Sequence, residues 1–127
     1  MALKKAGKSL FIITNDSYDF VNIALKETLG KYWLDLFDLC ICNSSQTLFF
    51  TTNKHFIEVD WDEDDLQGDK IATAEELKDF NSFGKTVVMG GNAFLLTACF
   101  QKQHKEDARV VFLTDNYLSD IVPIRAF

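Results

Sequence analysis

The sequence predicts one α/β domain in which helices pack on a parallel sheet, and three observations support this prediction. Apolar runs rich in strand-favouring residues occur at 9–14, 38–42 and 109–113. Residues 18–29, which follow the first run, have the apolar periodicity of a helix. The segment that begins after Asn92 and precedes the third run has it too. The length of 127 residues and the hydrophobic fraction of 47% are those of one ordinary domain. Strands that alternate with helices are typical of a layered α/β sheet.

The first half of the chain predicts a strand, a helix and a second strand. Residues 9–14 form the first strand, which ends at the polar turn 15–17. The apolar stripe of residues 18–29 predicts a helix, and Gly30 supplies its C-terminal stop. Residues 38–42 form the second strand. A helical crossover between two strands predicts parallel, right-handed pairing.

Residues 51–91 are expected to be a divergent, irregular insertion with a surface face. Thr73 and Glu76 have the spacing of a capping box and indicate a short helix. Seven acidic residues lie in one stretch without Lys or Arg: Glu58, Asp60, Asp62, Glu63, Asp64, Asp65 and Asp69. This stretch lacks the glycine and the final acid of a calcium-binding loop, so we expect a solvated loop that binds no metal tightly. After the insertion, Asn92 is a favourable N-cap for the next helix.

Charge and cysteine usage exclude several classes of function. The net charge of −6 argues against a nucleic-acid partner. No apolar run approaches the roughly 18 to 20 residues of a membrane span, so no membrane partner is expected. Cys40, Cys42 and Cys99 lie among apolar residues and are expected to be reduced core thiols. Together with the absence of a secretory leader, these thiols predict a cytoplasmic protein.

Polar residues that follow the predicted strands form a candidate site. Thr14 follows the first strand, and Asp115 and Asp120 follow the third. The carboxyl ends of parallel strands meet at one edge of a sheet, so these side chains are expected to converge. A hydroxyl, backbone amides and two carboxylates are what a Mg²⁺-dependent phosphoryl site uses. The alternative is that all three residues only cap strands and turns.

The order of several motifs resembles the cytosolic 5′-nucleotidase and 5′-nucleotidase domain-containing family of the haloacid dehalogenase-like superfamily. The resemblance covers most of residues 3–127, with a divergent middle, and the tail is most similar to the first domain-containing subtype. The stretches that carry it include LFIITNDSYDF, LGKYWLDLFD, LFF, GNA and VVFLTDNYLSDIVPIR, at residues 10–20, 29–38, 48–50, 91–93 and 110–125.

The resemblance implies a Mg²⁺-dependent phosphatase on a Rossmann-like parallel sheet, in which an Asp nucleophile forms an aspartyl-phosphate. By position, Thr14 is similar to the family's phosphate-binding Thr, and Asn15 offers its amide. Asp115 matches the metal-binding acid. Asp120 matches the acid that orients the catalytic lysine, and Gln46 occupies the position of that lysine.

The resemblance also implies an incomplete domain. The family's nucleophile strand, with its Asp-x-Asp motif, is missing from these 127 residues, and it is the central strand of the family's sheet. Residues 9–14 and 109–113 would flank it and would each be left with an open edge. Either these two strands pair directly, or a strand of another chain lies between them, or the sequence is a piece of a larger protein. Two functions stay open. One is a partial or degenerate 5′-nucleotidase-like phosphohydrolase that binds a nucleotide or phosphate but is inactive alone. The other is a non-catalytic module that binds a protein partner or itself.

Overall fold

The computed structural model of the chain describes residues 2–58, 70–72, 86–104 and 109–114. In chain order, the elements are α1 (Ala2–Lys5), β1 (Phe11–Ile13), α2 (Tyr18–Leu29), the 3-10 helix η1 (Trp33–Leu36), β2 (Leu39–Cys42), α3 (Gln46–Thr51), β3 (Phe56–Glu58), β4 (Lys70–Ala72), β5 (Thr86–Gly90) and α6 (Ala93–His104). The predicted α/β class is confirmed.

The described strands form one mixed sheet in the order β1-β2-β5-β3-β4. β1, β2 and β5 are parallel, with Phe11 opposite Leu39 and Cys40 opposite Val87. β3 is antiparallel to both β5 and β4. The expected parallel pairing is therefore confirmed for β1 and β2, and the sheet continues beyond them with an antiparallel part.

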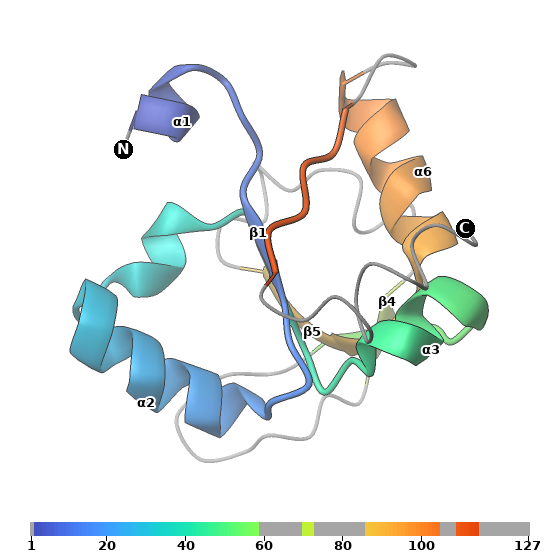
Figure 1. Cartoon of the computed structure of the whole chain (residues 1–127), viewed down its shortest axis with the longest axis horizontal. Helices are drawn as coiled ribbons and strands as arrows, with labels where there is room; N and C mark the ends of the chain where they lie inside the picture. The colour runs from blue at the N-terminus through green and yellow to red at the C-terminus, as the bar shows by residue number, and fades with distance from the viewer. Residues whose placement is uncertain (1, 59–69, 73–85, 105–108, 115–127) are drawn as a thin grey trace.

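Helices cover both faces of this sheet, and each face has its own core (Figure 1). On one face, α2 and η1 pack on alternate residues of β2, namely Cys40 and Cys42. On the other face, α3 and α6 pack on Leu39 and Ile41. Because both faces of β2 are buried, its residues are apolar without alternation.

The three cysteines are buried and free, as expected for core thiols. The Sγ atoms of Cys40 and Cys42 lie 3.6 Å apart on the face covered by α2. This hydrogen bond and the burial raise the pKa of Cys40 above its usual range. Cys40 therefore stays protonated, and both side chains pack in the core under α2.

The two long helices begin where the sequence predicts. Ser17 caps α2 by accepting a hydrogen bond from the backbone N–H of Phe20, and α2 ends before Gly30, whose φ is +92°. Asn92 precedes α6, and its Oδ1 accepts a hydrogen bond from the N–H of Leu95 at 3.0 Å. Local capping chemistry was sufficient to place these helix ends.

The interpretation of residues 51–91 as an irregular insertion is wrong in its most important part. β5 lies within this range and pairs with both β2 and β3 in the interior of the sheet. Its apolar residues Val87 and Val88 are almost completely buried, one in each core. Such a short run, bounded by glycine, gives no periodic signal, and its neighbours in the sheet are distant in sequence.

The prediction of a third buried strand at residues 109–113 is also wrong. This segment has no strand assignment, and Val111 and Leu113 are 78% and 88% exposed. It lies beside β1 without being hydrogen-bonded to it (Figure 1). The direct pairing of residues 9–14 with 109–113, one of the expected alternatives, is therefore not formed, and both sides of β2 are taken by β1 and β5.

The capping box at Thr73 and Glu76 and most of the acidic stretch lie outside the described residues, so both stay predictions. None of the helices in the described ranges is long and apolar enough to cross a membrane.

Candidate functional site

The loops after β1 and β2 meet at the carboxyl edge of the parallel strands. The N–H of Asn43 donates to the carbonyl of Asp16 at 2.9 Å, and the N–H of Ser44 donates to the carbonyl of Thr14 at 3.0 Å. Ser44 is almost completely buried. These bonds fix the two loops to each other, so the polar groups of residues 14–16 and 43–45 form one surface at this edge.

The Thr14 hydroxyl is held within its own loop. It donates to Oδ2 of Asp16 at 3.1 Å and accepts from the N–H of Asp16, also at 3.1 Å. Both residues reach the surface, since Thr14 is half-buried and Asp16 is exposed. A phosphate group that approached Thr14 would meet the Asp16 carboxylate, so either this side chain turns away or a cation lies between the two anions.

Asp16 is a site residue that the sequence reasoning did not single out. It lies two residues after Thr14, and its carboxylate contacts the hydroxyl. Oxygen donors of this kind suit a hard cation such as Mg²⁺. Among the described residues, however, no group of three His, Cys, Asp or Glu side chains comes together.

Asn43 directly follows β2 and is a second residue of this edge that has no assigned role in the sequence analysis. Its φ of +46° is a left-handed conformation that non-glycine residues seldom adopt. Its side-chain amide donates to Sδ of Met89 at 3.4 Å, which links the end of β2 to the end of β5. Asparagine tolerates this conformation better than most residues, so an Asn directly after a strand was the available signal.

Two helices begin at the same edge. α2 begins after Ser17, and α3 begins at Gln46 after the N-cap Ser45. Their N–H groups give this edge a partial positive charge, which favours anions. The backbone of Gln46 thus lies at the edge that carries Thr14 and Asn15.

Asp115 and Asp120 lie outside the described residues, so their convergence with Thr14 stays a prediction. Thr114, which directly precedes Asp115, is described and exposed, and it follows the segment that lies beside β1.

Comparison with known proteins identifies the family. The model of the 5' nucleotidase family matches residues 1–126. The human 5'-nucleotidase domain-containing protein 2 is 29% identical over 119 residues, which is 93% of this chain and 21% of that protein. The human 5'-nucleotidase domain-containing protein 1 is 30% identical over 129 residues, which is 98% of this chain and 26% of that protein.

A 5'-nucleotidase domain-containing protein of Dictyostelium discoideum is 32% identical over 100 residues, which is 67% of this chain and 17% of that protein. The chain thus spans about a quarter or less of the length of these relatives. The match over nearly the whole chain confirms the resemblance that the motifs indicated. The chain belongs to the 5' nucleotidase family.

Proposed function

We propose that this chain is part of a 5′-nucleotidase-like phosphohydrolase and that it binds the phosphate of a nucleotide at the edge formed by residues 14–16 and 43–46. One observation carries the proposal. The loops after β1 and β2 are hydrogen-bonded to each other at the carboxyl edge of parallel strands, next to the start of two helices. Membership of the 5' nucleotidase family supports a nucleotidase-like function for this edge.

In this proposal, each predicted residue has a separate task. The Thr14 hydroxyl and the Asn15 amide donate hydrogen bonds to phosphate oxygens, and the side chain of Gln46 binds the substrate. Asp115 binds Mg²⁺. The Asp16 carboxylate, which accepts a hydrogen bond from the Thr14 hydroxyl, is a second ligand of the ion. Asp120 corresponds to the acid that orients the catalytic lysine in the family.

We further propose that the chain by itself does not turn over its ligand. None of the five described strands contains an aspartate, so none of them carries the aspartate nucleophile that the resemblance implies. Gln46 is neutral where the family has a lysine that neutralises the phosphate. Without the covalent step and this charge, the remaining groups only bind and orient.

Phosphate binding tests this function. We expect inorganic phosphate with Mg²⁺ to shift the amide resonances of residues 14–16 and 43–46. Thr14→Val should weaken binding by about tenfold, the usual effect of losing one hydrogen bond to a charged group. Thr28→Val is the matched control, because Thr28 is exposed on α2 and its hydroxyl bonds to Ala24. Equal affinity of the wild type and Thr14→Val would contradict the proposal.

Phosphate release tests the proposed inactivity. We expect nucleoside monophosphates with Mg²⁺ to yield no more phosphate with the wild type than with Asp115→Ala. Gln46→Lys should bind phosphate about tenfold more tightly, because it restores a cation at the site, yet should still release none. Release that depends on Mg²⁺ and on Asp115 would show that the chain is an active enzyme.

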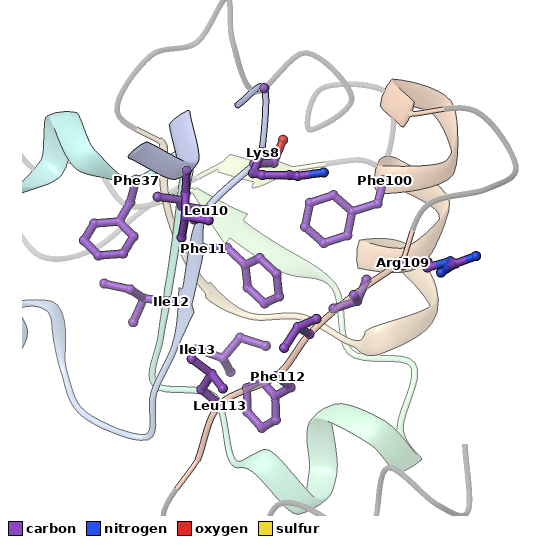
Figure 2. A pocket seen from close by; sticks show the side chains of 15 residues that line it. Lys8, Leu10, Phe11, Ile12, Ile13, Phe37, Phe100, Arg109, Phe112 and Leu113 are labelled. Carbon is purple, nitrogen blue, oxygen red and sulfur yellow. The ribbon is translucent and has the colours of Figure 1, made fainter. Parts of the chain in front are cut away.

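A second function, a protein-binding module, is favoured by a different observation. Among the described strands, β1 has a sheet neighbour on one side only, and an apolar groove lies along its other side (Figure 2). An open strand edge of this kind accepts a strand from another polypeptide.

A further inference from the structure

Three parallel strands end side by side at the edge that carries Thr14. Ile13 of β1 lies opposite Ile41 of β2, and Ile41 lies opposite Val88 of β5. The positions that follow these residues are therefore neighbours as well. Adjacent strands lie about 4.8 Å apart, so the edge spans about 10 Å from Thr14 to the end of β5. This span is the length of an extended mononucleotide.

Thr14 and Met89 lie on the same side of the sheet. Ile12, Cys42 and Met89 all pack against the core under α2. Because side chains alternate between the two faces of a strand, Thr14, two positions after Ile12, belongs to that side as well. Cys42 lies opposite Met89 in the register of β2 and β5. Thr14 and Met89 are therefore the two ends of one row of side chains along the edge.

Asn43, which follows Cys42, presents an exposed side-chain amide at the middle of this row. Its backbone is fixed, since its N–H donates to the carbonyl of Asp16 at 2.9 Å and its φ is +46°. One side-chain N–H donates to Sδ of Met89 at 3.4 Å, and a thioether is a weak acceptor.

The rest of this amide has no partner in the described part of the chain. No described residue donates a hydrogen bond to Oδ1 of Asn43, and none accepts one from its second side-chain N–H. An amide can make hydrogen bonds through both of these groups. One acceptor and one donor are thus available to a ligand, at a position that the backbone holds in place.

Met89 provides an apolar surface beside the amide. Its side chain is half-buried and packs on the core under α2. Thioether sulfur makes favourable contacts with aromatic rings. The pair of Asn43 and Met89 therefore offers hydrogen bonds next to an apolar contact. This combination suits a sugar that is joined to an aromatic base.

The charge at the three strand ends differs. The carboxylate of Asp16 contacts Thr14 at the end of β1, whereas residues 43–47 after β2 and residues 89–93 at the end of β5 are all neutral. The β2 and β5 ends therefore offer hydrogen bonds but no ion pair. A ligand that fits the edge has its charged group at Thr14 and a neutral, hydrogen-bonding body over β2 and β5.

We propose that Asn43 and Met89 form the nucleoside subsite for a phosphate ester bound at Thr14. A ribose hydroxyl bonds to the amide of Asn43 at the end of β2, and the base contacts Met89 at the end of β5. The ligand class is a ribonucleoside 5′-monophosphate, which lies along the edge with one of its three parts at each strand. Both residues thus determine specificity. This inference rests on the first proposed function, because it takes the position of the phosphate from it.

A series of three ligands tests the subsite. The affinities of the chain for inorganic phosphate, ribose 5-phosphate and uridine 5′-monophosphate are measured with Mg²⁺ present. We expect the affinity to rise by about tenfold at each step, because the sugar adds hydrogen bonds and the base adds a contact with a thioether. The side-chain amide resonances of Asn43 should shift with ribose 5-phosphate and not with inorganic phosphate.

Asn43→Gly separates a ligand contact from a structural role. It removes the amide and keeps the backbone, because glycine adopts a positive φ without strain. The variant should bind ribose 5-phosphate and uridine 5′-monophosphate about tenfold more weakly than the wild type does, with unchanged affinity for inorganic phosphate. Asn53→Gly is the matched control, because Asn53 is exposed before β3, one strand beyond β5, and it should change none of the three affinities.

Met89→Ala tests the contact with the base. This variant should bind uridine 5′-monophosphate no more tightly than ribose 5-phosphate, because the surface under the base is lost. Its affinity for ribose 5-phosphate should stay that of the wild type, since Asn43 loses only a weak bond to sulfur. Met89→Leu keeps an apolar side chain of similar volume and should retain most of the gain from the base.

Two results would overturn this inference and leave the first proposed function intact. One is that the wild type binds the three ligands with equal affinity. The other is that Asn43→Gly weakens binding of inorganic phosphate as much as binding of the two larger ligands, which would show that Asn43 only holds the loops together. A third result, no shift of the amide resonances of residues 14–16 with any of the ligands, would contradict the first proposed function as well, because the phosphate position would be wrong.

Discussion

Gly91 lies between β5 and α6 with a φ of +78°, a conformation that side chains rarely adopt. A Cβ atom at this position would lie 2.0 Å from the ring of Phe56, which is completely buried. We therefore expect Gly91→Ala to lower the free energy of unfolding by about 3 kcal/mol, from overpacking and backbone strain together.

Gly7→Ala is the control for Gly91→Ala, because Gly7 has a similar φ of +72° but no atom within 4 Å of the added Cβ. Its expected cost is about 1 kcal/mol, from the backbone alone. Urea denaturation of the two variants measures both costs. Equal losses would mean that the ring of Phe56 moves aside.

Tyr18 is the first residue of α2, and its side chain is buried against the sheet. Burial raises the pKa of its hydroxyl to about 12 from an ordinary value of 10.0. The folded state thus keeps a proton that the unfolded state loses first. This contribution to stability is fully present below pH 10 and is lost as the pH rises towards 12.

Tyr18→Phe should therefore remove part of the alkaline loss of stability, whereas Tyr32→Phe should not, because the side chain of Tyr32 is exposed. The measurement is the free energy of unfolding as a function of pH for the three proteins. Identical pH profiles for the wild type and Tyr18→Phe would show that Tyr18 titrates normally.

At the scale of elements, the start of α6 depends on one buried side chain. Oδ1 of Asn92 caps the helix at Leu95, and its Nδ2 donates to the carbonyl of Lys54 at 2.7 Å. Asn92→Ala removes both of these part-buried hydrogen bonds. We expect a loss of about 2 kcal/mol in the free energy of unfolding.

Ser17→Ala at the start of α2 is the comparison for Asn92→Ala. The Ser17 bond to Phe20 is longer, at 3.4 Å, and exposed, so its loss should cost less than about 1 kcal/mol. Thermal unfolding followed by circular dichroism distinguishes the two. If Ser17→Ala were the more damaging variant, the cap of α6 would not be the critical one.

The elements that the sequence predicts correctly are those with local signals. The α2 helix has its apolar stripe and a polar cap, and β2 is a compact apolar run between polar residues. β5 and residues 109–113 are both short apolar runs, and the prediction assigned the strand to the wrong one. Only a partner strand distinguishes them, and a partner strand is not a local property.

At the scale of the molecule, β5 connects the two cores. Val87 packs in the core under α2, and Val88 packs in the core under α3 and α6. Val87→Ala and Val88→Ala should each cost about 2 kcal/mol and should lower the same cooperative transition. Val111→Ala, at an exposed position, should change the free energy of unfolding by less than about 0.5 kcal/mol.

Unfolding monitored by tryptophan fluorescence and by circular dichroism tests this connection between the cores. Coincident transitions in both Val variants are expected, because β2 and β5 contribute residues to both faces. A variant in which one signal is lost before the other would show that the two faces unfold separately.

The sequence predicts the part of the candidate site that depends on strand direction. Thr14, Asn15 and Gln46 follow strands whose direction the helical crossover determines, so their common edge could be derived from the sequence. The contact between Asp16 and Thr14, and the left-handed Asn43, depend on how two loops meet. The arrangement of these two loops cannot be derived from the hydrophobic periodicity of the sequence.

Motif order, composition and local hydrogen bonding are sufficient to identify the family, the α/β class, the buried thiols and the starts of the two long helices. Which apolar run enters the sheet, and which one forms the wall of the groove beside β1, depends on contacts between segments that are distant in the chain. Every apolar run gains from burial, but a strand is stable only where a neighbouring backbone satisfies its N–H and C=O groups, and that neighbour is chosen by the fold as a whole.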